Sequence, residues 1–433
     1  MKEKLTRTVF EQSRELEFFT EKELEMQIGH SIDWWPITIL RELIDNALDG
    51  CENSNISPKI EIEINDNSFT VTDNGTGLSS QVIKKSQDYL KRVSDKAYYV
   101  SPTRGQMGNA LKVIYAAPYV LNGEYGKVEI WSKGLHHTVE ISLDRISQKP
   151  ILQHSKQKCV VKNGTKIKIY IPNSASLKSS ETADFYNPPM TAMELIGSYA
   201  AFNPHATFHY DDKTWEATNK KWKKWRSDTP TSPHWYSSET MRNLIAAYIK
   251  KENDGGRVMT VREFVSEFKG LSSTIKQKQV TEGFSGIYLH DLVKDNDIDM
   301  EFVASLLTRM QEKSKPVKPH VMGVIGEEHL KKQILSFGCT EDSFNYARRK
   351  GDDGLPFVME FAFGVMKEEE ANIWKRRIIT GLNWSPALQT PAHEIDESIG
   401  KMRIDDHDPV ILIVHMVKPR FDFTDKGKTR VSL

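Results

Sequence analysis

The apolar positions in the first part of the chain predict one helix followed by a β-hairpin. Between Pro36 and Cys51, apolar residues recur at helical spacing: Leu40, Leu43, Ile44, Ala47 and Leu48. Beyond this stretch, apolar and polar residues alternate, at Ile60, Ile62 and Ile64 and again at Phe69 and Val71. Asp66-Asn67 supplies a turn between the two alternating runs, so we predict two paired strands.

Further alternating runs predict that these strands belong to a larger sheet. The runs are Val128 to Trp131, Val139 to Leu143 and Ile167 to Ile171. Alternation on one side only indicates a sheet whose second face is wet, or one that helices cover on one face. We therefore predict an α+β sandwich for residues 1–215.

The rest of the chain predicts two more domains, in agreement with a length of 433 residues that exceeds one ordinary core. After a connector rich in Lys and Trp, residues 216–314 contain helical patterns near Ser238–Lys251, Val261–Phe268 and Met300–Lys313. Residues 315–433 begin with a linker and a helix near Glu327–Ser336. A strand at Phe357–Val365, a helical stretch from Lys367 and a strand at Val410–Val417 then suggest a parallel β-α-β unit.

The charge balance does not predict a polyanionic partner. The chain has 59 Lys plus Arg and 59 Asp plus Glu, so any basic site must be local. The only dense cationic run is Lys220-Lys-Trp-Lys-Lys-Trp-Arg226. It either contacts DNA phosphates or forms a solvated connector whose tryptophans pack on a neighbour, and we favour the connector.

Cysteine usage and hydropathy predict a soluble, cytoplasmic protein without membrane association. The three cysteines are far apart, which fits neither a disulfide framework nor a metal cluster. The amino terminus has no apolar signal core, and the longest apolar run, Val410 to Val417, is too short to span a bilayer.

The first candidate site lies on the predicted first helix. Glu42, Asn46 and Asp49 are spaced i, i+4 and i+7 and therefore share one face. Solvated faces normally mix in Lys or Arg, and none occurs between Glu42 and Glu52. Oxygen ligands without a cation suit Mg²⁺ together with phosphate oxygens. A plain solvated surface remains the alternative.

The second candidate is Asp73-Asn74-Gly75-Thr76-Gly77. Counting by twos from Phe69 and Val71 places Asp73 on the inward face, at the end of its strand. A buried carboxylate requires a donor, which an adenine amino group supplies, and Gly75 and Gly77 let backbone approach a flat base. Asp-Asn-Gly is also ordinary turn chemistry.

Two further elements complete the set. Arg104-Gly105-Gln106-Met107-Gly108-Asn109 precedes a helical pattern at Ala110 to Ala117, and glycines before a helix leave amides free to hold phosphates. Gly164-Thr165 stands before the Ile167 strand. No P-loop occurs, because Gly-Lys-Ser/Thr is absent.

The order and spacing of these four elements resemble the GHKL ATPase superfamily. Glu42 to Asn46 is similar to its N box, Asp73 to Gly77 to its adenine box, and Arg104 to Lys112 to its phosphate-binding lid, with Gly164-Thr165 as the last box. The resemblance implies a GHKL (Bergerat) fold that binds ATP and Mg²⁺.

Later segments resemble the B subunits of topoisomerase VI. These segments are Ser198 to Ala206, Pro233-His234, Val324 to Glu328, Leu382 to Ala387, and Phe423 to Lys428. The resemblance implies a helix-two-turn-helix domain, a transducer domain and a switch loop. It also implies a homodimer that forms on ATP binding and gates double-stranded DNA, with residues before about Thr20 as an exchanged strap. DNA cleavage would belong to a separate A-type subunit, since we find no motif for it here.

The resemblance also implies roles for individual residues. Glu42 would be the general base, Asn46 would hold Mg²⁺, Asp73 would read adenine, and Lys428 would reach the γ-phosphate, with Lys426 as its competitor. The remaining residues assigned to nucleotide binding are Asp49, Gly75, Gly77, Lys96, Arg104, Gly105, Gln106, Met107, Gly108, Asn109, Ala110, Leu111, Lys112 and Thr165.

Three features depart from the family pattern. Ala110 replaces a third lid glycine, which restricts the backbone there. The spacing of Ser94-Asp95-Lys96 differs from an adjacent Ser-Lys pair. The chain ends at Leu433 without a long stalk helix, so either a longer protein exists or coupling differs.

Two alternatives to a topoisomerase component follow from the same motifs. One is a stand-alone GHKL ATPase that acts as an ATP-dependent DNA clamp or signalling ATPase in a mobile element or defence system. The other is a nucleotide-binding scaffold without hydrolysis, which the presence of Glu42 disfavours.

Overall fold

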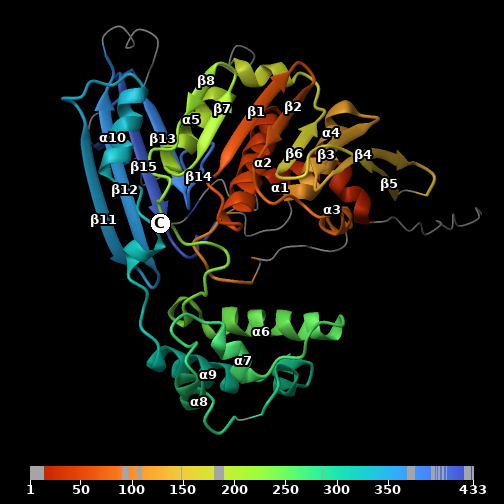
Figure 1. Cartoon of the computed structure of the whole chain (residues 1–433), viewed down its shortest axis with the longest axis vertical. Coiled ribbons are helices and arrows are strands. Elements are labelled where there is room, and N and C mark those ends of the chain that lie inside the picture. The colour runs from red at the N-terminus through yellow and green to blue at the C-terminus, as the bar shows by residue number, and fades with distance from the viewer. Residues whose placement is uncertain are drawn as a thin grey trace, which may run out of the picture.

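The computed structural model describes most of the chain. The described residues are 14–89, 96, 98–104, 110–147, 149–179, 190–284, 286–367, 376–391, 395, 397, 400, 401, 404, 405, 407–423 and 431. Figure 1 shows three regions: a large sheet with its helices, a smaller sheet beside it, and a helical region below both. We call them the large-sheet region (14–215), the small-sheet region (319–431) and the helical region (233–314).

The large-sheet region is an eight-stranded sheet in the order β5-β4-β3-β6-β2-β1-β7-β8. Its strands are β1 (Lys59–Asn65), β2 (Ser68–Thr72), β3 (Gly126–Ser132), β4 (Leu135–Asp144), β5 (Lys149–Lys158), β6 (Thr165–Ile169), β7 (Thr207–Tyr210) and β8 (Lys213–Trp215). Every neighbouring pair is antiparallel except β1 and β7. The predicted hairpin of β1 and β2 and the predicted α+β class are confirmed.

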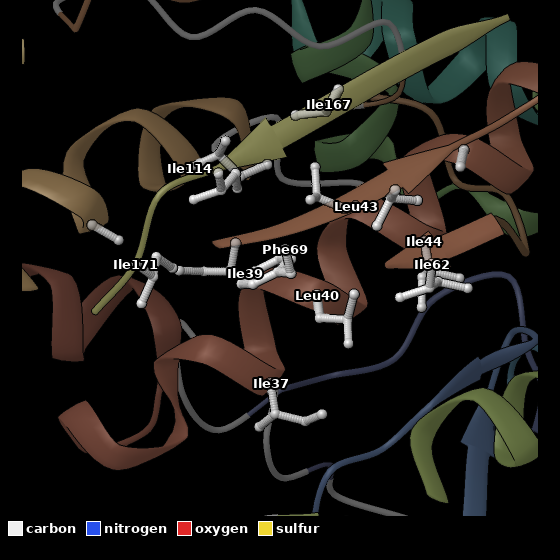
Figure 2. Close-up of a cluster of buried hydrophobic side chains, with 14 of the residues drawn as sticks. Ile37, Ile39, Leu40, Leu43, Ile44, Ile62, Phe69, Ile114, Ile167 and Ile171 are labelled. Atoms are coloured by element: carbon white, nitrogen blue, oxygen red, sulfur yellow. The ribbon is translucent and has the colours of Figure 1, made fainter. Parts of the chain in front are cut away.

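Helices pack against this sheet as the apolar periodicity predicted. They are η1 (Arg14–Phe19), α1 (Glu21–Ile28), η2 (Ile32–Trp34), α2 (Trp35–Glu52), α3 (Ser80–Ser86), α4 (Ala110–Asn122), η3 (Ser174–Lys178) and α5 (Ala192–Phe202). Leu40 and Leu43 of α2 lie in one buried cluster with Ile62 of β1 and Phe69 of β2 (Figure 2). Burial alternates along β1, so its second face stays exposed.

The helical region contains the helices that its periodicity predicted. Its elements are η4 (Pro233–Trp235), α6 (Ser238–Asn253), α7 (Val261–Ser266), α8 (Thr274–Val280), η5 (Leu289–Leu292), the short pair β9 (Val293–Lys294) and β10 (Asp297–Ile298), and α9 (Met300–Lys313). Ser237 and Thr260 cap α6 and α7 by accepting backbone N–H groups, which fixes where these helices begin.

The small-sheet region has a five-stranded sheet in the order β11-β12-β15-β13-β14. It contains η6 (Pro319–Met322), α10 (Glu327–Ser336), β11 (Asn345–Asp352), β12 (Pro356–Val365), β13 (Arg377–Leu382), β14 (Ser385–Pro386) and β15 (Val410–Val417). Helix α10 has the bounds that the sequence predicted, and it packs on β12.

The predicted parallel pairing of the Phe357–Val365 and Val410–Val417 strands is wrong. Strand β12 runs antiparallel to β15, and the parallel neighbour of β15 is β13. The prediction missed β13 because its apolar run is short and lies where a helical stretch from Lys367 was expected. Residues 368–375 lie outside the described part, and the chain is extended from Arg377. The crossover to β15 therefore starts from β13.

Candidate active site

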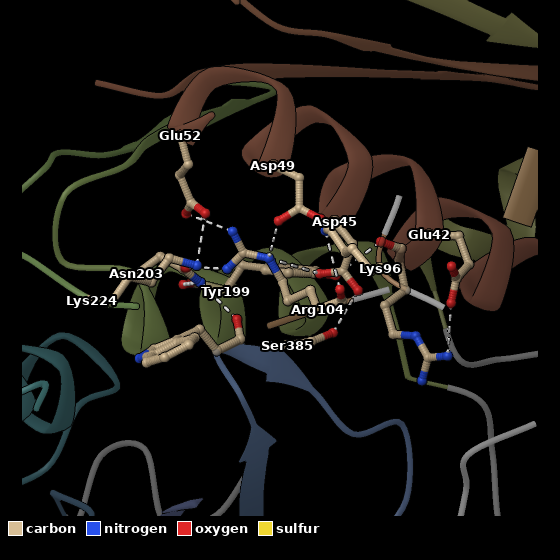
Figure 3. Close-up of polar contacts among 12 residues, drawn as sticks. Glu42, Asp45, Asp49, Glu52, Lys96, Arg104, Tyr199, Asn203, Lys224 and Ser385 are labelled. Atoms are coloured by element: carbon tan, nitrogen blue, oxygen red, sulfur yellow. Dashed lines mark hydrogen bonds and ion pairs between the residues drawn. The ribbon is translucent and has the colours of Figure 1, made fainter. Parts of the chain in front are cut away.

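Helix α2 carries a polar face that ends against the small-sheet region (Figure 3). Glu42, Asp45, Asp49 and Glu52 all project from this helix, whose opposite side is buried in the core. Glu42 is 28% exposed, and one of its carboxylate oxygens lies 3.2 Å from Arg41 Nη2. Asn46 is exposed. Glu42 is therefore accessible to water while remaining fixed by a neighbouring cation.

Two cations from a distant segment meet this face, which lacks cations of its own between Glu42 and Glu52. Lys96 Nζ lies 2.5 Å from Asp49 Oδ2 and donates a hydrogen bond to the carbonyl of Arg104. Arg104 Nε lies 3.3 Å from Asp49 Oδ1. Both predicted phosphate ligands thus contact a carboxylate of α2 here, and their nucleotide role stays a prediction.

Arg104 is the centre of a buried ionic cluster. Its Nη2 lies 2.5 Å from Glu52 Oε1, and its Nη1 donates to Asn203 Oδ1 at 3.0 Å. Burial would lower the pKa of Arg104, but attraction to Glu52, Asp49 and Asp45 raises it overall. The cluster is tightly satisfied, as a buried guanidinium requires.

Glu52 receives three donors at the end of α2. Besides Arg104, they are Lys224 Nζ at 2.7 Å and His205 Nε2 at 2.9 Å. Burial alone would raise the pKa of Glu52, but Arg104 and then Lys224 hold it well below its ordinary value. Sequence reasoning missed Glu52 because its partners come from segments far apart in the chain.

Lys224 explains the cationic run of the connector. Its ammonium is buried 4.5 Å above the ring of Trp384, and burial lowers its pKa to about 8. Trp225 is 2% exposed, and Trp222 Nε1 donates to the Val324 carbonyl at 2.6 Å. The interpretation of this run as a connector with packed tryptophans is confirmed for these residues.

Asp45 links α2 directly to the small-sheet region. Its carboxylate accepts hydrogen bonds from the Tyr199 hydroxyl at 2.8 Å and from Ser385 Oγ at 2.7 Å. Burial raises its pKa to about 6, although Arg104 opposes that shift. Asp45 was not predicted as a site residue, because it lies beside the predicted face of the helix.

A pocket opens between Glu42 and the small-sheet region. Its lining residues are Arg41, Glu42, Asp45, Thr103, Arg104, Leu382, Asn383, Ser385, Pro386, Ala387, Phe421 and Phe423. Arg41 Nε and Thr103 Oγ1 are buried and have no hydrogen-bond partner among the described residues. The pocket therefore offers two donors beside the Glu42 carboxylate, where an incoming polar ligand can be bound.

A second carboxylate, Asp73, lies at the end of β2 as predicted. It accepts the N–H groups of Gly75 at 2.8 Å and Thr165 at 3.2 Å. Burial raises its pKa to about 6, and no cation among the described residues pairs with it. Asp73 can therefore still accept a donor from a ligand.

Glycines shape the backbone around Asp73. Gly164 has φ +74°, and a Cβ there would lie 2.0 Å from the carbonyl oxygen of Asp73. Gly77 has φ +82°, and its Cβ would lie 2.5 Å from Ser132 Oγ. Any other residue would move the strand end that carries Asp73.

Several predicted residues fall at or beyond the edge of the described part. Gly105, Gln106, Met107, Gly108 and Asn109 lie outside it, as do Lys426 and Lys428. Helix α4 starts at Ala110, and Leu111 is half-buried. Lys112 is buried, and its Nζ donates to the Tyr89 carbonyl at 3.1 Å.

Within the described ranges, every helix is too short or too polar to traverse a lipid bilayer.

Comparison with known proteins follows the same geometry. Residues 35–175 match the family described as histidine kinase-, DNA gyrase B-, and HSP90-like ATPase. This match covers α2, Asp73 and Thr165, and so it includes both carboxylate sites.

Curated relatives match most of the chain, and each is the B subunit of type 2 DNA topoisomerase 6 in its organism. The chain is 20% identical to the Archaeoglobus fulgidus protein, over 92% of this chain and 66% of that protein. It is 22% identical to the Sulfurisphaera tokodaii protein and 24% identical to that of Metallosphaera sedula, each over 91% of this chain and 75% of the relative. The chain thus spans slightly less than two thirds of the first relative and three quarters of the other two.

Proposed function

We propose, because residues 35–175 form a domain of the histidine kinase-, DNA gyrase B- and HSP90-like ATPase family, that this chain is the ATP-hydrolysing component of a type IIB, topoisomerase VI-like DNA topoisomerase. The observation that carries the proposal is the placement of Glu42, a partly exposed carboxylate at a pocket shared by α2 and the small-sheet region. A hydrolytic site coupled to a second domain requires such a junction.

Two carboxylates would divide the work on ATP. Asp73 accepts the adenine amino group, since its local donors are backbone amides and no described cation neutralises it. Glu42 orients and deprotonates the attacking water, which its exposure allows. The side chains of Glu42 and Asn46 offer the oxygen donors that suit Mg²⁺, which would neutralise the phosphates when bound.

The pocket supports a switch from the small-sheet region. Phe421 and Phe423 line it beside Glu42 and directly precede the segment that contains Lys426 and Lys428. We expect Lys428 to reach the γ-phosphate from there. Hydrolysis then removes the partner of this lysine and frees the two regions to rotate.

The proposed partners follow from the relatives, which are B subunits of a two-component topoisomerase by name. The chain would dimerise on ATP, enclose a DNA duplex and act with a separate A-type protein that cleaves DNA. Lys220, Lys221 and Lys223 remain exposed for phosphate contact, whereas Lys224 is buried. A stand-alone clamp would use the same ATP site, but similarity to topoisomerase components along 91% to 92% of the chain favours the topoisomerase.

Glu42→Ala tests the proposal. We expect phosphate release to fall at least about 100-fold while ATP binding persists, because a positioned base contributes about 10²–10⁴-fold. Glu61→Gln, an exposed carboxylate on β1, is the matched control and should hydrolyse ATP like the wild type. Hydrolysis that survives Glu42→Ala would contradict the assigned role.

A plasmid relaxation assay with the candidate cleaving protein tests the second half of the proposal. ATP-dependent relaxation is expected from the pair and not from either chain alone. DNA-stimulated hydrolysis without relaxation would favour the stand-alone clamp.

A further inference from the structure

The segment that leads to Arg104 is held by the helical region. Figure 1 shows this segment, drawn in orange, below the large sheet on the side that faces α6. Val100 is 5% exposed and belongs to the apolar cluster that includes Tyr236 and Phe264. Residues 98–104 therefore follow the helical region as well as the sheet from which they come.

Hydrogen bonds from two tyrosines fix this contact. The N–H of Val100 donates to the Tyr236 hydroxyl at 3.1 Å. The hydroxyls of Tyr99 and Tyr248 lie 2.6 Å apart, and Tyr248 in turn donates to Glu267. Tyr236 and Tyr248 lie at the start of the helical region and on α6. The contact is thus specific in direction and not apolar packing alone.

The same segment is fixed to α2 at its two ends. Lys96 lies 2.5 Å from Asp49, and Arg104 lies 2.5 Å from Glu52. The N–H of Tyr99 donates to the Lys96 carbonyl at 3.2 Å, which ties the tyrosine contact to that lysine. A shift of Tyr99 or Val100 must therefore move the cations that contact the polar face of α2.

We propose that Tyr236 and Tyr248 are positioning residues, through which the helical region sets the ATP affinity of the α2 site. They act through residues 98–104, which place Lys96 and Arg104 on the helix that carries Glu42. This proposal rests on the proposed ATPase function. Loss of either hydroxyl leaves the segment less ordered, so ATP binding must supply the cost of ordering it.

The test uses the full chain with Tyr248→Phe or Tyr236→Phe and measures steady-state phosphate release. Each variant should raise the KM for ATP about three- to tenfold, the range expected for one hydrogen bond, with kcat near the wild-type value. Tyr288→Phe is the matched control, since Tyr288 is a 42% exposed tyrosine of the helical region that stacks on His290. A KM unchanged or lowered in both variants would overturn the proposal.

A double-mutant cycle separates positioning from general loss of stability. Tyr99→Phe removes the other hydroxyl of the Tyr99–Tyr248 pair from outside the helical region. The Tyr99→Phe/Tyr248→Phe double variant should show the KM of either single variant, because both act on one contact. Fully additive effects would overturn it. If the wild type fails to hydrolyse ATP, the proposed function has failed; if it hydrolyses ATP and the variants match Tyr288→Phe, only this inference has failed.

Discussion

Two largely buried carboxylates of the large-sheet region, Asp73 and Glu52, have opposite electrostatic environments. Asp73 has backbone N–H donors, and burial raises its pKa to about 6. Glu52 has Arg104, Lys224 and His205 around it, and its pKa is held well below the ordinary value. One carboxylate remains able to accept a ligand donor, and the other is fully used within the protein.

The contrast separates binding from assembly. Asp73 depends on residues close to it in the folded strand ends, at β2 and β6. Glu52 joins α2, the segment before Arg104 and the connector that carries Lys224. We therefore expect substitutions at Asp73 to change nucleotide binding, and substitutions around Glu52 to change the stability of the whole arrangement.

Arg104→Met should have the largest effect. It leaves Glu52, Asp49 and Asp45 without their common cation, and removal of one partner from a buried ion pair costs about 3–5 kcal/mol. Chemical denaturation measures the change in the free energy of unfolding. Arg226→Met, at an exposed pair with Asp228, is the control and should cost less than about 1 kcal/mol.

A companion variant sharpens the result for Arg104. Adding Glu52→Gln to Arg104→Met removes one uncompensated charge and should recover part of the lost stability. Equal stability of the Arg104→Met and Arg226→Met variants would mean that the buried cluster does not hold the regions together.

Asp73→Asn should show the reverse pattern. An amide oxygen still accepts the Gly75 and Thr165 N–H groups, so the free energy of unfolding at pH 8 should not fall. ATP binding should weaken about 10- to 100-fold, as expected for loss of a hydrogen bond to a charged group. Calorimetric titration with ATP measures this. Unchanged affinity would remove Asp73 from the adenine site.

Local patterns predicted the Asp73 site better than the Glu52 cluster. The alternation of Phe69 and Val71 placed Asp73 at a strand end, and helical spacing gave the polar face of α2. Arg104 was predicted from its place before two glycines, but its contact with Glu52 spans 52 residues. Such contacts depend on how domains pack, which periodicity along one segment does not encode.

The strand β13 was missed for a similar reason. Its parallel pairing with β15 is made only after the chain has crossed the sheet, and its short sequence resembles the end of a helix. The same hairpin brings Ser385 to Asp45. The part of the site contributed by the small-sheet region therefore required the three-dimensional structure.

The smallest expected effect is the pH dependence of ATP binding. Because the folded pKa of Asp73 is raised from 3.8 to about 6, its ionised form costs stability above pH 6, and this cost disappears as the pH falls towards 3.8. Glu52 has the opposite sign: its lowered pKa stabilises the fold above about pH 4.5, and this contribution is lost as the pH falls through its folded pKa.

ATP binding should therefore weaken below about pH 6 while the fold persists. Protonation of Asp73 removes the charged acceptor for adenine, so affinity should fall by up to about tenfold per pH unit below that point. Titrations at saturating Mg²⁺ keep the phosphates ionised. Asp45 also has a pKa of about 6, so Asp73→Asn is the necessary control. If that variant keeps the wild-type slope, the pH dependence belongs to Asp45 and the contact with Ser385, and the distinction between a binding carboxylate and an assembly carboxylate must be redrawn around α2.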